Sequence, residues 1–108
     1  MKVKTSELTY NQLSYAVCLI EMPHLVWGES IGLHWASNQV VVPIIEREAI
    51  NIRCMRSAPD PTKIAWWESF VFASSDRVYQ GSTPLIAAMR CYVASKLGDE
   101  VEIPEELA

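Results

Sequence analysis

The densest group of charged side chains in the body of the chain is Glu46-Arg47-Glu48. Two carboxylates on one side of a segment could hold a divalent cation or carry out acid–base chemistry. Glu46 and Glu48 would share a face in an extended segment, but would point about 200° apart in a helix. The alternative is an ion pair between Arg47 or Arg90 and one of these acids. The sequence leaves both roles open.

Nucleophilic catalysis finds no support in the histidines and cysteines. A serine or cysteine nucleophile needs a histidine that is itself oriented by a partner. His24 and His34 are the only histidines, and neither lies in a recognisable nucleophile motif. The three cysteines are far apart and form no CxxC pair, so they suggest neither a zinc knuckle nor a redox dithiol. We predict no catalytic residue, no metal ligand and no cofactor, and the sequence favours a non-enzymatic protein.

Aromatic residues offer a different kind of surface. Trp66 and Trp67 are adjacent in a segment that reads as a strand, so their side chains should point to opposite faces. One of them can be buried in the core, and the other would meet a second layer, a partner or solvent. Exposed aromatic residues are enriched at protein interfaces. The residues that we predict to bind a partner are Trp35, Glu46, Arg47, Glu48, Trp67 and Arg90.

The charge distribution argues against nucleic acid and membrane as partners. The net charge is −4, and the nine basic residues are scattered rather than gathered in a stripe. Nucleic-acid affinity depends mainly on such a basic surface. The longest apolar runs are far shorter than the ~20 residues of a membrane span. Together with the missing signal peptide, this predicts a cytoplasmic protein.

Two segments carry strong helix signals. A threonine followed three residues later by Gln12 forms a capping box at the start of a predicted helix over residues 10–21. A second helix, residues 84–97, has Thr83 as its N-cap, a proline at its first position and Gly98 just after its end. Each helix has an apolar stripe at helical spacing, which predicts that both pack against one core.

Strand signals occupy the middle of the chain. Residues 50–56 alternate between apolar and polar, residues 57–62 form a turn, and residues 64–73 are rich in aromatic and β-branched types. These features predict an antiparallel hairpin. The β-branched run Val40–Val42 predicts a further short strand, and residues 2–8 an extended lead-in or edge strand. The predicted fold is α+β, with a small antiparallel sheet of about three strands packed against an N-terminal and a C-terminal helix.

The last ten residues stand apart in composition. They contain five of the thirteen acidic residues. We therefore predict a single domain over residues 1–98 and an acidic, solvated tail over residues 99–108. The alternative is a tail that meets a basic partner.

Three stretches of the sequence resemble the NinX-like proteins of lambdoid phages and prophages. They are the opening MKVKTSELT, the hexapeptide PIIERE (43–48) and the closing block TPLIAAMRCYVASKLGDEVEIPEEL (83–107). Before PIIERE, where the family has a polar segment with a tryptophan, this chain has HWASNQVVV, with Trp35 as the counterpart. The resemblance implies an accessory protein in the cytoplasm of an infected bacterium, and it implies no reaction.

The sequence supports three hypotheses about function. The first is a phage or prophage accessory protein that acts by protein–protein contact, with a host protein, a phage protein or a second copy of itself as partner. The second is a small metal-dependent or acid–base enzyme built around Glu46 and Glu48. The third is a nucleic-acid-binding protein.

Overall fold

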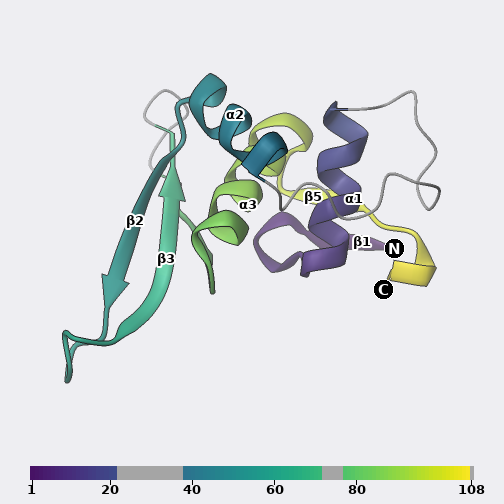
Figure 1. Ribbon diagram of the computed structural model, residues 1–108. Helices are drawn as coiled ribbons and strands as arrows, with labels where there is room; N and C mark the ends of the chain where they lie inside the picture. Colours follow the sequence, from purple (N-terminus) through teal and green to yellow (C-terminus); the bar gives the residue numbers. More distant parts are fainter. Residues whose placement is uncertain (22–37, 72–76, 108) are drawn as a thin grey trace.

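The computed structural model describes residues 1–21, 38–71 and 77–107, without the side chains of residues 38–40. Three helices and two small antiparallel sheets make up this part of the chain, which confirms the predicted α+β fold (Figure 1). Short 3₁₀ helices lie near both ends. In chain order the main elements are β1 (Lys2–Lys4), α1 (Tyr10–Glu21), α2 (Asn38–Glu48), β2 (Asn51–Arg56), β3 (Ile64–Phe70), β4 (Tyr79–Gly81), α3 (Pro84–Leu97) and β5 (Glu100–Glu102).

Strands β2, β3 and β4 form one antiparallel sheet in that order, with β3 in the centre. Helix α3 lies against one face of it. On that face, the Ser69 hydroxyl donates a short hydrogen bond to the carbonyl of Ala87. Gly81 also lies there, where a Cβ would be 2.5 Å from the backbone nitrogen of Ala87. The absence of a side chain at residue 81 therefore lets β4 approach the helix backbone closely.

The core lies between α3, α1, α2 and the chain ends. α3 supplies its largest share, and the C-terminal strand region also contributes. Its fully or nearly fully buried members include Leu8, Leu13, Ala16, Val17, Val41, Ile44, Ala88, Met89, Tyr92, Val93, Val101 and Ile103. Because residues from both ends of the chain belong to this one cluster, the described residues form a single core.

The two predicted helices have the bounds that their end signals indicated. The backbone N–H of Thr9 donates to Gln12 Oε1 at 3.0 Å, as one half of the capping box requires. Thr83 Oγ1 accepts from the N–H of Ile86 at 3.1 Å, and Gly98 ends α3 with a φ of 91°. These local contacts explain why the helices begin and end where the sequence indicated.

The predicted strand Val40–Val42 is wrong. These residues lie in helix α2, which continues through Pro43 to Glu48. Val41 and Ile44, three positions apart, are buried in the core on one side of α2. Burial of a helical face therefore outweighs both the β preference of the valines and the missing N–H of the proline.

The acidic segment after α3 is not the solvated tail that its composition suggested. Glu100–Glu102 form β5, which pairs antiparallel with β1, with Val3 opposite Val101. Val101 and Ile103 point into the core, while the glutamates between and beside them are exposed. The alternation of acidic and apolar residues is that of a strand with one buried face.

The β2–β3 hairpin extends beyond the helices. Figure 1 shows its far end projecting from the rest of the molecule, well away from α1 and the chain ends. Cross-strand pairs run from Asn51 with Phe70 to Met55 with Trp66, and the register shifts between Met55 and Arg56. The predicted hairpin and its turn are thus confirmed.

Candidate functional site

Arg47 lies at the centre of a polar cluster that joins all three helices. Its Nη2 atom donates to Glu21 Oε2 at 2.8 Å and to the hydroxyl of Tyr92 at 3.1 Å, and its Nε atom donates to Glu48 at 3.0 Å. Tyr92 in turn donates a short hydrogen bond to Glu21. Lys96 Nζ lies 3.2 Å from the other oxygen of Glu48. One arginine thus connects the end of α1, the end of α2 and the middle of α3.

The electrostatics of this cluster favour its charged form. A hydrogen bond from Arg47 lowers the pKa of Glu48. Burial works against the ionised form of Glu21, but hydrogen bonds from Arg47 and Tyr92 outweigh it and lower its pKa. Burial and the hydrogen bond to Glu21 raise the pKa of Tyr92, so its phenol stays neutral. Each ionised group therefore has an opposite charge or a donor beside it, which is the pattern of a structural ion-pair network.

The two acids considered for metal or acid–base chemistry do not share a side. Both lie on α2, two positions apart, so they point about 200° apart. Glu46 is exposed, while Glu48 turns towards Arg47 and Lys96. Among the residues that the structure describes, no three His, Cys, Asp or Glu side chains are grouped to hold a metal ion.

The side chain of Arg90 connects two segments by binding their backbone carbonyl groups. Its Nη2 and Nε atoms donate to the carbonyl of Leu8 at 2.9 and 3.3 Å, and its Nη1 atom donates to the carbonyl of Gln80 at 2.7 Å. The guanidinium thereby ties the start of α1 to β4 across α3. Its fork of donors suits this purpose better than a single ammonium group would.

The adjacent tryptophans point to opposite faces of the sheet, as expected. Trp67 shares the face of Ser69 towards α3 and is half-buried. Trp66 is on the other face and is 38% exposed. Trp35, the other aromatic residue predicted to bind a partner, lies outside the described residues, and so do both histidines.

The face of Trp66 carries a continuous row of interacting side chains. Arg53 and Glu68 are directly opposite each other on β2 and β3, and Arg53 Nη2 lies 2.7 Å from Glu68 Oε1. The other oxygen of Glu68 accepts from Trp66 Nε1 at 3.1 Å. The Arg53 guanidinium also lies over the ring of Phe70, 5.3 Å from its centre. We call this surface the hairpin face; it consists of Asn51, Arg53, Met55, Trp66, Glu68 and Phe70.

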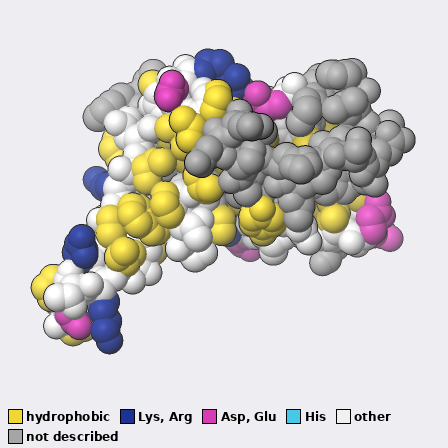
Figure 2. Space-filling view, in the orientation of Figure 1, with side chains coloured by type: hydrophobic (Ala, Val, Ile, Leu, Met, Phe, Trp, Pro, Cys, Tyr) yellow, Lys and Arg dark blue, Asp and Glu magenta, His cyan; other side chains and the backbone are white. Residues whose placement is uncertain are grey.

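Hydrogen bonding fixes the charge state of the hairpin face. Donors from Trp66 and then Arg53 lower the pKa of Glu68, so this carboxylate is ionised at neutral pH. Glu68 is almost fully covered by its neighbours, whereas about half of the Arg53 side chain is exposed. Figure 2 shows hydrophobic side chains gathered along the projecting hairpin, with basic side chains beside them.

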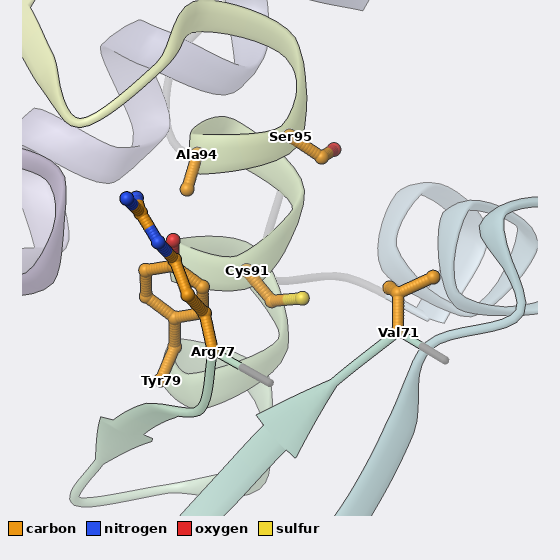
Figure 3. Close-up of a pocket in the computed structure, with 6 residues that line it drawn as sticks. All are labelled: Val71, Arg77, Tyr79, Cys91, Ala94 and Ser95. Atoms are coloured by element: carbon orange, nitrogen blue, oxygen red, sulfur yellow. The ribbon is translucent and has the colours of Figure 1, made fainter. Parts of the chain in front are cut away.

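A small cavity lies between β3, β4 and α3 (Figure 3). Its volume is about 150 Å³, and Cys91 extends into it from α3 towards Val71. Burial raises the pKa of Cys91, which keeps the thiol protonated and poorly nucleophilic. Cys18 and Cys91 are both buried free thiols.

Comparison with known protein families shows which family the chain belongs to. A model of the family described as bacteriophage P22 NinX matches residues 34–96, which include α2, the three-stranded sheet and nearly all of α3. The chain belongs to the NinX family. The predicted resemblance is thereby confirmed, and it makes this a member of a phage protein family. The NinX match contains the hairpin face and all of the Arg47 cluster except Glu21. No curated protein matches the chain.

Part of these sites could be predicted from the sequence. Arg47 and Glu48 stand out there as members of an ion pair, whereas Glu21 and Tyr92 are 26 and 45 positions from Arg47 and no local pattern links them to it. Trp66 and Trp67 both stand out as well, and Trp67 was the one predicted to bind a partner. The alternation of β3 alone cannot tell which face α3 covers.

Proposed function

We propose that this phage protein works by binding another protein through the hairpin face. The observation that supports this most is the position of that face. It lies on the side of the sheet away from α3, on a hairpin that projects from the body, and it carries an exposed tryptophan (Figure 1). Tryptophan, methionine, phenylalanine and arginine are the residue types enriched at protein interfaces, and four of the six residues are of these types.

A protein partner fits this surface better than a nucleic acid. Arg53 is already paired with Glu68, so the centre of the face has no net charge. Nucleic-acid binding depends on unpaired basic side chains that release counterions from phosphates. The described helices also include none long and apolar enough to cross a membrane. We place the contact in the cytoplasm of an infected bacterium, in keeping with the phage family.

Photo-crosslinking in bacterial cells tests the proposal directly. A photoreactive phenylalanine analogue replaces Trp66, and in a matched variant it replaces Leu97, which is 40% exposed on α3. Leu97 is ten positions beyond Ala87, so it lies about 15 Å farther along the helix axis than the contact with the sheet. We expect illumination of infected cells to give a discrete adduct from the Trp66 position and none from the Leu97 position.

The mass of the adduct identifies the class of partner. Twice the mass of the chain indicates a second copy, and any other discrete protein mass indicates a different partner. The proposal is wrong if the Trp66 position gives no protein adduct, or if both positions give the same adducts. Nucleic acid recovered with the adduct would support the nucleic-acid hypothesis instead.

A further inference from the structure

The hairpin face has a charge pattern that is complementary to itself. A basic and an acidic side chain, Arg53 and Glu68, sit directly opposite each other at the centre of the face. On one side of this pair lie Met55 and Trp66, and on the other lie Asn51 and Phe70. Each hairpin-face residue of β2 thus has a hairpin-face residue of β3 directly opposite it.

A two-fold axis parallel to the strands makes use of this pattern. When two sheets stack ~10 Å apart about such an axis between β2 and β3, β2 of one copy lies over β3 of the other. Arg53 of each copy then lies over Glu68 of the other, and Met55 of each lies over Trp66. An axis across the strands would place Arg53 over Arg53, which like-charge repulsion disfavours.

Packing in this orientation keeps α3 out of the interface. Contacts of α3 with the sheet are on the face of Ser69 and Gly81, so α3 would lie on the outside of both sheets. The stacking also buries no unpaired charge, because Arg53 and Glu68 are already paired within each copy. A buried charge that had lost its partner would be strongly destabilising.

We propose that the partner of the hairpin face is a second copy of this chain, packed face to face about that two-fold axis. This inference rests on the proposed function and names its partner. The face has six residues on each side, against the 20–30 of a standard stable interface, so the dimer is weak and depends on concentration. A weak dimer leaves the hairpin face accessible in much of the population at low concentration.

Sedimentation equilibrium over a concentration series tests the association. For the full-length wild-type protein, we expect the weight-average mass to rise from that of the monomer towards twice that value between about 10 μM and 1 mM. Trp66→Gln should shift this rise to at least tenfold higher concentration. A wild-type protein that stays monomeric over the whole range overturns the inference.

A charge-reversal pair tests the orientation. Arg53→Glu gives the face two acids, and Glu68→Arg gives it two bases, so each variant should stay monomeric alone. An equimolar mixture should associate at least as strongly as wild type, because each acidic face then meets a basic one. Lys2→Glu, on β1, carries the same change in net charge as Arg53→Glu and should associate like wild type.

The outcomes separate the two proposals. Circular dichroism first confirms that each variant is folded, and Trp66→Gln remains as a readout if a charge reversal does not fold. If the mixture fails to associate while wild type does, the two-fold arrangement is wrong. If wild type is monomeric but the Trp66 crosslink identifies a different protein, the further inference fails and the proposed function stands.

Discussion

At the scale of single residues, Arg47 shows how a charged motif can have a structural role. In the sequence it is the centre of a dense charge cluster, for which metal binding by the two acids and ion pairing were both possible roles. In the structure it contacts one residue on each of the two neighbouring helices, Glu21 and Tyr92, as well as Glu48 beside it. Its partners are far away in the sequence, so only the fold could reveal them.

The pKa shifts of this cluster predict how stability depends on pH. The pKa values of Glu21 and Glu48 are lowered in the folded state from an ordinary 4.5. Lowered carboxylate pKa values stabilise the fold above the unfolded value, and this contribution is lost as pH falls through the folded value. We expect the free energy of unfolding in urea to decrease below about pH 4.5.

A pair of variants assigns this decrease to the cluster. Glu21→Gln should be less stable than wild type at pH 7 and should show a shallower loss between about pH 4.5 and pH 3. Glu106→Gln, which removes an exposed carboxylate outside the cluster, is the control and should follow the wild-type curve. Equal slopes for Glu21→Gln and wild type would show that the cluster does not contribute to the pH dependence.

At the scale of elements, the sequence predicted those whose ends are marked by local contacts. Thr83 marks the start of α3 with a side-chain cap, and Gly98 marks its end with a positive φ. The prediction of a strand at Val40–Val42 is wrong because β-branched residues indicate only a local preference. Burial in the tertiary structure decides which secondary structure forms. Val41, Ile44 and Ile45 have helical spacing, but the run of valines and Pro43 argue against a helix when the sequence is considered alone.

Gly81 gives an element-scale prediction. Gly81→Ala should destabilise the protein by roughly 1–3 kcal/mol, because the added Cβ meets the backbone of Ala87 and the side chain of Ile86. Gly98→Ala is the comparison: its Cβ would enter open space, and its backbone conformation alone, φ 91° and ψ −164°, should cost roughly 1–3 kcal/mol. Urea unfolding monitored by circular dichroism measures both. No loss of stability in Gly81→Ala would mean that α3 moves away from β4 without cost.

At the scale of the whole molecule, the acidic C-terminal segment packs against the N-terminal residues and completes the core. Thr5 N–H donates to the carbonyl of Asp99 at 2.8 Å, and Gln12 Nε2 donates to the carbonyl of Leu107 at 3.0 Å. Composition described the glutamates of this segment correctly as exposed. It did not show that Val101 and Ile103, alternating with them, complete the core.

Ile103→Ala tests this role of the segment. Ile103 is completely buried, so the truncation should cost roughly 2–5 kcal/mol. Glu105→Gln removes a charge two positions away at an exposed site and should change stability by no more than about 0.5 kcal/mol. Thermal and urea unfolding of the two variants distinguish a core segment from a solvated one. A similarly small change in stability for both variants would mean that the segment can detach from the core without destabilising the fold.

The pairing of β1 with β5 also sets an order of events during synthesis. The first strand leaves the ribosome early, but its partner lies roughly a hundred residues later. At translation rates of ~5–20 residues per second, about 5–20 s pass between the synthesis of β1 and that of β5, and β1 has no strand partner during this time. A nascent chain that stalls before residue 100 lacks Val101 and Ile103 and leaves the core surface around Leu8 and α1 uncovered. Until the segment after α3 has been translated, the surface around Leu8 and α1 therefore stays accessible to proteases.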